Sequence, residues 1–174
     1  MPGTPTLRVR PVTPALADAV RALRVDSGQY AYVGDVACHL VDAHGPPGAE
    51  AMAILAGDEV IGFYRIEHRV TVVTLSPLGP AAVGLRSFLI DRGWQGRGLG
   101  APAMQALCDD LAQRYRQVRL LALNVNCGNV AAIRAYRRAG FVDTGEIAFG
   151  GTAGPQQLML RHLPPAAVGE SAHG

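Results

Sequence analysis

The chain has 174 residues and a formal net charge of +2, with 49% hydrophobic and 17% charged residues. This length and composition indicate one globular domain, and the small net charge gives no electrostatic case for binding nucleic acid or a membrane surface. No apolar run reaches the roughly 18 residues of a membrane helix. The start of the chain also lacks the pattern of a signal peptide, so we expect a cytoplasmic protein.

The first predicted elements are a strand and a helix. Residues 6–12 alternate apolar and charged side chains, which predicts a short strand with one wet face. Thr13 before Pro14 predicts a helix start that the threonine caps, and Asp26-Ser27-Gly28 predicts its end. Residues 29–43 fit no single pattern.

Residues 35–68 predict an optional short helix, a loop and a hairpin. A short helix from Asp35 to Val41 is one option, and residues 44–48, with two prolines and two glycines, predict a loop. The clearest hairpin pairs Ala51–Ala56 with Val60–His68 across Gly57-Asp58-Glu59.

The middle of the chain is more apolar. Residues 69–75 extend the second hairpin strand or form their own, and residues 76–84 predict a surface loop. Leu85–Asp91 is apolar on both faces, which is typical of a strand at the centre of a sheet. A helix follows the glycine-rich turn at 92–100, because Leu99, Ala103, Leu107 and Leu111 recur at four-residue steps.

The last third reads as strand, helix and a closing pair of strands. The predicted segments are Val118–Val125, Asn129–Ala139, Phe141–Ala148 and Gln156–Leu163, with a flexible tail at 164–174. The three cysteines, Cys38, Cys108 and Cys127, form neither a Cys-x-x-Cys pair nor a metal pattern with histidines. We therefore expect free thiols and no metal site.

The turn at residues 92–100, Arg-Gly-Trp-Gln-Gly-Arg-Gly-Leu-Gly, predicts an anion site. Its backbone N–H groups lie at the positive end of a helix, and glycine lets an anion approach the main chain. A kinase-type phosphate loop is excluded because the chain contains no lysine. The dinucleotide fingerprint is matched by Gly96, Gly98 and Ala101, but the next strand ends in Asn124-Val125-Asn126 instead of the acidic residue that holds the ribose.

A third pattern fits two separate segments. Gln95-x-x-Gly98-x-Gly100 resembles the pyrophosphate loop of the GCN5-related N-acetyltransferases (GNAT family), which bind acetyl-coenzyme A. Residues 129–141, Asn-x-x-Ala-x-x-x-Tyr-x-x-x-Gly-Phe, resemble a later segment of the same family. Taken alone, that segment also reads as a helix capped by Asn129 and Gly140 with Tyr136 in the core. Both segments occur in the family's order and spacing.

The resemblance implies a fold. It implies an α/β domain with a mixed, mostly antiparallel sheet of about six or seven strands flanked by about four helices. We expect a single domain over residues 1–174, with a core at 6–163.

The resemblance also implies an acetyl-coenzyme A site and assigns residues to it. Strand residues Phe88, Leu89 and Ile90 would pair with the pantetheine chain, and an N–H near Ile90 would polarise the thioester carbonyl. Asn129 would bond the coenzyme's amide arm. The pyrophosphate would be held by residues 95–100, which are Gln95, Gly96, Arg97, Gly98, Leu99 and Gly100. An exposed Arg97 without any role is an equal alternative.

Two side chains are the candidates for proton transfer. Tyr136 is the expected general acid, because an ordinary tyrosine is protonated at neutral pH and can donate to the leaving thiolate. Glu67, near the end of a strand that lines the acceptor side in this family, is the candidate base. Its alternative is a solvated strand-end glutamate. His68 and Asp91 are weaker candidates, and Asp91 can also serve only to fix the loop.

The implied reaction is direct transfer of an acetyl group to the primary amine of a small molecule in a ternary complex. Ile90-Asp91-x-x-Trp94-Gln95-Gly96 and Phe141-x-x-Thr144-Gly145-Glu146 look closest to bacterial spermine/spermidine acetyltransferases, and residues 29–43 resemble their acceptor-side segment. The acids that would suit a cationic amine are Asp26, Asp35, Asp42, Glu50 and Glu67.

Other functions stay open. The acceptor could instead be a protein N-terminus, an amino acid or an aminoglycoside. A different class is a non-catalytic acyl-coenzyme A sensor. The expected partner is thus a small-molecule amine, with a homodimer as the candidate assembly.

Overall fold

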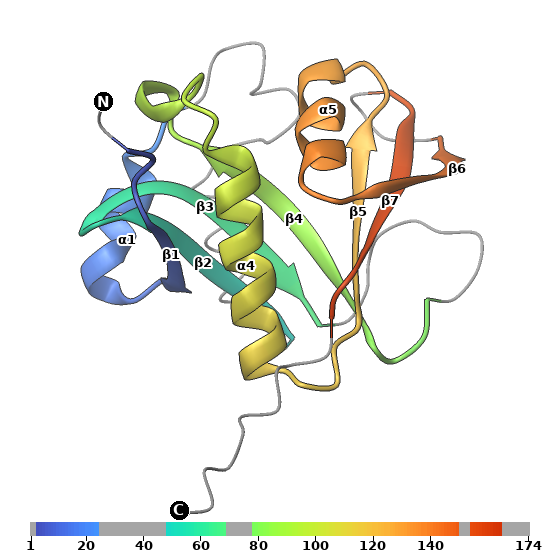
Figure 1. Ribbon diagram of the computed structural model, residues 1–174, viewed down its shortest axis with the longest axis horizontal. Helices are drawn as coiled ribbons and strands as arrows, with labels where there is room; N and C mark the ends of the chain where they lie inside the picture. The colour runs from blue at the N-terminus through green and yellow to red at the C-terminus, as the bar shows by residue number, and fades with distance from the viewer. Residues whose placement is uncertain (1–2, 25–47, 69–77, 150–153, 165–174) are drawn as a thin grey trace, which may run out of the picture.

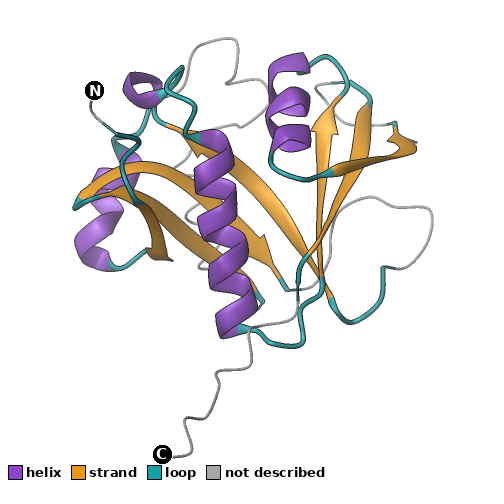
Figure 2. Ribbon diagram, in the orientation of Figure 1, coloured by secondary structure: helices purple, strands orange, loops and turns teal. Residues whose placement is uncertain are grey.

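The computed structural model describes residues 3–24, 48–68, 78–149 and 154–164. The elements in chain order are β1 (Leu7–Pro11), α1 (Pro14–Arg21), β2 (Ala49–Ala56), β3 (Glu59–Glu67), β4 (Ala82–Ile90), the 3-10 turn η1 (Arg92–Trp94), α4 (Gly100–Arg114), β5 (Leu120–Asn126), α5 (Val130–Arg138), β6 (Val142–Ala148) and β7 (Gln156–His162) (Figures 1 and 2).

The strands form a seven-stranded sheet in the order β1-β2-β3-β4-β5-β7-β6. Neighbouring strands are antiparallel except β4 and β5, which are parallel. The predicted mixed, mostly antiparallel sheet is therefore confirmed. The described part of the chain holds three α-helices, against about four expected.

The parallel pair comes apart soon after it forms. Only Ala82–Gly84 of β4 pair with Leu120–Ala122 of β5. Beyond Gly84 and Ala122, the strand ladder pairs β4 with β3 and β5 with β7, and the ladder between β4 and β5 does not continue into residues 85–90 and 123–126. We call these two segments the diverging edges (Figure 1).

A β-bulge lies on β4 within the diverging edges. Phe63 pairs with Leu89 but Arg65 pairs with Arg86, so β4 has one residue more than β3 in this interval. Ser87 takes a positive φ of 58°, which is uncommon for a residue with a side chain. The bulge bends β4 away from a regular pairing geometry at this point.

The helices cover both faces of the sheet. α4 and α5 lie on one face (Figure 1), where Leu99, Ala103, Leu107 and Leu111 are all 3% exposed or less, as the four-residue spacing predicts. On the other face, Val20 of α1 belongs to a smaller cluster with side chains of β2, β3 and β4. The sheet is thus buried on both sides where it carries β3 and β4.

Some predicted boundaries are wrong. Residues 82–84, predicted as part of a loop, belong to β4, because Gly84 lies in the strand opposite Glu67 and Ala122. The helix α1 ends at Arg21, and Thr13 stands at its N-cap position without a side-chain hydrogen bond.

Other predictions lie outside the described residues. They concern the end signal at 26–28, the segment at 29–43 with its option of a helix at 35–41, most of the loop at 44–48, the segment at 69–75, the first residues of the loop at 76–84, and nearly all of the tail at 164–174. Among the helices that are described, none is long and apolar enough to cross a membrane.

Candidate active site

The glycine loop, residues 92–100, is fixed at its start by Asp91. The Asp91 carboxylate accepts hydrogen bonds from the backbone N–H of Gly93 (3.0 Å) and of Arg24 (2.8 Å). The N–H of Arg92 in turn donates to the Arg24 carbonyl at 2.6 Å. Asp91 therefore joins the loop to the end of the α1 segment, and of its two predicted roles the loop-fixing one matches its contacts.

The loop leaves open space in front of its main chain. Gly96 and Gly98 have φ of 75° and 71°, and a Cβ atom at either position would meet no atom within 4 Å. The helix α4 then begins at Gly100 without a side-chain cap. Backbone N–H groups at an uncapped helix start are an anion site, because they carry the positive end of the helix dipole.

Two loop side chains brace the loop from within. Gln95 donates from Nε2 to the Ile90 carbonyl at 2.9 Å. Arg97 donates to the Gly93 carbonyl at 3.0 Å, and its guanidinium lies 4.6 Å from the centre of the Trp94 ring. Arg97 thus contacts its own loop, and its role toward the pyrophosphate stays a prediction.

The backbone N–H of Ile90, at the end of β4, points toward the diverging edges. The N–H of Asp91 donates to Ile61 of β3 at 2.7 Å. Because successive backbone groups of a strand point to opposite sides, the N–H of Ile90 points away from β3 and toward the β5 side. Ile90 and Phe88 pack with the core under α4, whereas Leu89 belongs to the core on the α1 face.

The helix α5 begins and ends with defined caps. Asn129 accepts a hydrogen bond from the Ala132 N–H at 3.2 Å, which confirms the predicted N-cap. At the other end, the N–H groups of Gly140 and Phe141 donate to the carbonyls of Arg137 (3.1 Å) and Tyr136 (3.0 Å). This is the Schellman arrangement, and Gly140 supplies its left-handed residue with a φ of 93°.

Tyr136 is held between two phenylalanine rings. Phe141 lies 5.5 Å from it and Phe88 lies 6.3 Å from it, both edge-to-face at 64°. Phe88 belongs to the bulged part of β4, so the structure brings Tyr136 to the diverging edges. Burial raises the pKa of Tyr136 to about 12, which keeps the phenol protonated at neutral pH.

Glu67 lies on the other face of the sheet. It is two and four residues from Arg65 and Phe63 in β3 and so shares their side, which packs against α1. Glu67 is 8% exposed, and its Oε1 lies 2.8 Å from Arg65 and 3.7 Å from Arg86. The alternative of a solvated strand-end glutamate is therefore wrong.

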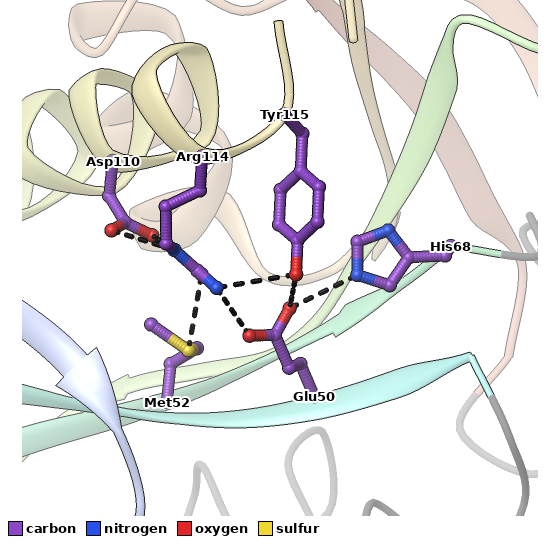
Figure 3. Close-up of polar contacts among 6 residues, drawn as sticks. All are labelled: Glu50, Met52, His68, Asp110, Arg114 and Tyr115. Atoms are coloured by element: carbon purple, nitrogen blue, oxygen red, sulfur yellow. Dashed lines mark hydrogen bonds and ion pairs between the residues drawn. The ribbon is translucent and has the colours of Figure 1, made fainter. Parts of the chain in front are cut away.

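Glu50 and His68 belong to a separate polar network beneath the end of α4 (Figure 3). Glu50 accepts hydrogen bonds from Arg114 (2.6 Å) and from the Tyr115 hydroxyl (2.7 Å), and His68 Nε2 lies 3.0 Å from it. Burial opposes the charge of Glu50, but these hydrogen bonds outweigh it and lower the pKa of Glu50. Since Glu50 pairs with Ile66, it faces the opposite side of the sheet from Glu67, and the structure does not bring these two acids together.

Metal-ligand clusters and free thiols are the remaining features of the described residues that bear on chemistry. Within the ranges that the structure describes, no three His, Cys, Asp or Glu side chains gather closely enough to hold a metal ion. Cys108 and Cys127 are free thiols, and burial raises the pKa of the Cys108 thiol to about 11.

The element order, the glycine loop before α4 and the diverging edges define an acetyltransferase domain of the kind that the two sequence motifs resemble. The chain belongs to the acetyltransferase (GNAT) family, whose sequence model matches residues 19–141. It is an N-acetyltransferase.

The chain is similar to several named acetyltransferases. The chain is 28% identical over 158 residues to a spermine/spermidine N(1)-acetyltransferase of Bacillus subtilis (strain 168), covering 91% of this chain and 99% of that protein. Its fold is similar to an aminoglycoside acetyltransferase, AAC(6′)-Ib, solved with coenzyme A and kanamycin, with a TM-score of 0.67, 19% identity and coverage of 90% and 94%. It is also similar to the spermidine N-acetyltransferase of Vibrio cholerae solved with coenzyme A and spermine, with a TM-score of 0.65, 16% identity and coverage of 91% and 96%.

The residues present fit coenzyme A. Its pyrophosphate needs main-chain donors without side chains in front of them, and the space before Gly96 and Gly98 meets that need. Its pantetheine arm needs a strand edge along which a neighbouring strand does not continue. The ladder between β4 and β5 does not continue into residues 85–90, where the Ile90 N–H points toward the β5 side. Because β4 and β5 are parallel, the glycine loop and Asn129 follow the same edge of the sheet.

Two features of the site were missed from the sequence. The β-bulge at Ser87 has no signature in an apolar strand, since the positive φ falls on a serine instead of a glycine. Arg161, which contacts the end of α5, gives no signal either, because its partners lie on two other elements.

Proposed function

We propose that this chain transfers the acetyl group of acetyl-coenzyme A to the primary amine of a small molecule, with a polyamine as the first candidate. The observation that carries the proposal is the contact of Tyr136 with Phe88, which lies in the strand that ends at the glycine loop. A direct acetyl transfer needs a proton donor, a strand edge that presents an N–H to the thioester, and an anion loop.

Each part has a role in the proposed reaction. Residues 95–100 hold the pyrophosphate through backbone N–H groups, and Asn129 bonds the amide arm. Phe88, Leu89 and Ile90 present the strand edge to the pantetheine chain, and the Ile90 N–H polarises the thioester carbonyl. These groups bind and orient through the main chain, so the reaction needs no covalent link to the protein.

Proton transfer completes the proposed reaction. The amine nitrogen attacks the thioester carbonyl carbon, the C–S bond breaks, and Tyr136 donates its proton to the departing thiolate. Glu67 accepts a proton from the amine through water, from the opposite face of the sheet. Arg65 and Arg86 hold the Glu67 carboxylate in place, which supports an ordered position for this base.

The polyamine acceptor rests on the curated relatives and on local motifs. The relatives that match 91% of the chain are named spermine or spermine/spermidine acetyltransferases. Of the acids predicted to suit a cation, Glu50 is held by Arg114 and Tyr115, and Asp26, Asp35 and Asp42 lie outside the described residues. Within the described part of the chain, Glu67 is therefore the carboxylate that supports a polyamine as the acceptor.

A second candidate acceptor is an aminoglycoside, supported by the fold similarity to AAC(6′)-Ib. A protein N-terminus and an amino acid are further candidates. A non-catalytic acyl-coenzyme A sensor would keep the glycine loop but would have no need of a protonated Tyr136 at the diverging edges.

The test is release of coenzyme A from acetyl-coenzyme A over a panel of spermine, spermidine, aminoglycosides, amino acids and short peptides. We expect turnover that depends on the amine, highest with spermine or spermidine. Turnover highest with aminoglycosides would replace the polyamine by the second candidate. Tight coenzyme A binding with no turnover across the panel would overturn the proposal and favour the sensor.

A further inference from the structure

Arg161 of β7 contacts both helices that flank the diverging edges. Its Nη1 donates to the carbonyl of Ala139, the C-cap residue of α5, at 2.6 Å. Its Nη2 donates to Oε1 of Gln105 in α4 at 3.0 Å. The guanidinium therefore joins α5 to α4 through one rigid, planar group.

The position of Arg161 is determined on several sides. The Gln105 amide is oriented by its own hydrogen bond to Asp109 at 2.8 Å, which leaves its oxygen for Arg161. At Gly140, a Cβ atom would lie 3.5 Å from Nε of Arg161, so the arginine runs along the end of α5. A cation at the last carbonyls of a helix is also favoured by the helix dipole.

The two joined helices carry the two halves of the proposed chemistry. The helix α4 begins at the glycine loop, and α5 holds Tyr136 one turn before Ala139. The separation of the two helices sets the distance from the coenzyme's phosphate end to the phenol. A shift of about 1 Å in such a distance is enough to cost about 100-fold in rate.

We propose that Arg161 is a positioning residue of the acetyl transfer, which holds Tyr136 at its working distance from the coenzyme by fixing α5 against α4. This inference rests on the proposed function. Among the described residues, the contacts of Arg161 are with Ala139, Gly140 and Gln105 and not with Tyr136 or the glycine loop, so it acts through the helix that carries Tyr136.

The test compares Arg161→Ala with Tyr136→Phe, alone and combined. We expect Arg161→Ala to lower kcat by about 10- to 100-fold while the affinity for coenzyme A, followed by the fluorescence of Trp94, stays unchanged. In the Tyr136→Phe background, Arg161→Ala should cause no further loss of kcat, because a misplaced phenol and a missing one have the same effect. Arg161→Lys should restore part of the rate, since an ammonium replaces one of the two contacts.

Arg119→Ala is the matched control. Arg119 also donates to two backbone carbonyls, of Arg116 (2.7 Å) and Val118 (3.3 Å), but it lies directly before β5, at the end of that strand opposite to α5. It should leave kcat unchanged. If Arg161→Ala does not fold, Gln105→Leu breaks the α4 contact alone and should show the same split between kcat and affinity.

Other outcomes overturn the inference. An unchanged kcat in folded Arg161→Ala would do so. A double variant whose kcat is reduced by the product of the two single reductions would also do so, because Arg161 would then act independently of Tyr136. An unchanged kcat in Tyr136→Phe would leave nothing for Arg161 to position. A wild-type protein without turnover would overturn the proposed function itself. Turnover in the wild-type protein with the same kcat in Arg161→Ala would overturn this inference alone.

Discussion

Gly62 lies so close to Leu89 that a Cβ atom on Gly62 would come within 2.6 Å of the Leu89 carbonyl oxygen. The same atom would lie 3.0 Å and 3.2 Å from the Cδ1 atoms of Ile54 and Ile90. Gly62 therefore lets β3 approach β4 in the segment that carries Phe88, Leu89 and Ile90. Only a residue without a side chain fits this contact.

Gly62→Ala should destabilise the fold by about 1–3 kcal/mol, because the added methyl group forces backbone atoms apart in a packed region. Urea unfolding would measure the loss as a lower midpoint. Gly3→Ala is the control, since a Cβ atom there meets nothing within 4 Å. Equal stability of the two variants would show that β4 shifts at no cost.

Tyr136→Phe should lower kcat by about 10²- to 10⁴-fold and leave coenzyme A affinity nearly unchanged, because it removes the proton donor and keeps the ring. The pKa of Tyr136, raised by burial to about 12, adds a prediction on pH. A raised pKa means that the phenol stays protonated further into the alkaline range, so the wild-type kcat should show no loss from this group up to its ordinary value of 10.0. Rates from single-turnover experiments across this range would check it, and full activity of the variant would remove Tyr136 from its role.

Gly98→Val should abolish coenzyme A binding without unfolding the protein, because the branched side chain would fill the space in front of the loop amides. Gly145→Val is a close control. Both glycines have positive φ, 71° and 80°, and both face open space, but Gly145 lies in β6. The two variants carry the same kind of backbone strain, of about 1–2 kcal/mol. Titration of coenzyme A against Trp94, the single tryptophan, separates them; if both bind, the loop does not hold the pyrophosphate.

Glu50→Gln should destabilise the protein by about 1–3 kcal/mol at neutral pH, because hydrogen bonds from Arg114, Tyr115 and His68 lose their charged acceptor. The folded-state pKa of Glu50 is lowered from its ordinary value of 4.5. Its stabilising effect is thus present above that pH and is lost as the pH falls through the folded value. Unfolding curves of both proteins should therefore converge in acid. Asp58→Asn is the control, because the Asp58–Arg8 pair is fully exposed on its acidic side; curves that stay parallel at all pH values would contradict the assignment.

Tyr64→Phe should leave stability unchanged or raise it by about 1 kcal/mol, because a buried hydroxyl without a partner costs free energy. Within the described residues, the Tyr64 hydroxyl is buried and has no hydrogen-bond partner, and burial raises its pKa far above the ordinary value. Tyr115→Phe, which loses a bond to Glu50, should be destabilising by comparison. A clear loss of stability in Tyr64→Phe would reveal a bound water at the hydroxyl.

The confirmed predictions depend on residues that are close together in the sequence. The helix from Leu99 to Leu111 follows from a four-residue apolar period, and the cap at Gly140 follows from a glycine before an apolar residue. Both depend on neighbours within a few residues, which a sequence displays directly. The loop predicted over residues 76–84 is wrong at its end, because Gly84 lies in β4 between two strands and not in a turn.

The predictions that needed long-range geometry were incomplete. Glu50 and Glu67 are both predicted to suit a cationic amine, but the alternation along β2 and β3 places them on opposite faces of the sheet. Arg161 joins residues that lie 22 and 56 positions away along the chain. No local pattern indicates such a contact.

By itself, the sequence determined the family's elements, the glycine loop and the capped helix that carries Tyr136, because turns, caps and periodicity depend on nearby residues. The tertiary structure alone decided where β4 and β5 part, which face each acid occupies, and how Arg161 links α4 to α5. These features depend on strand register and on packing between distant segments, and both are set only when the whole chain has folded.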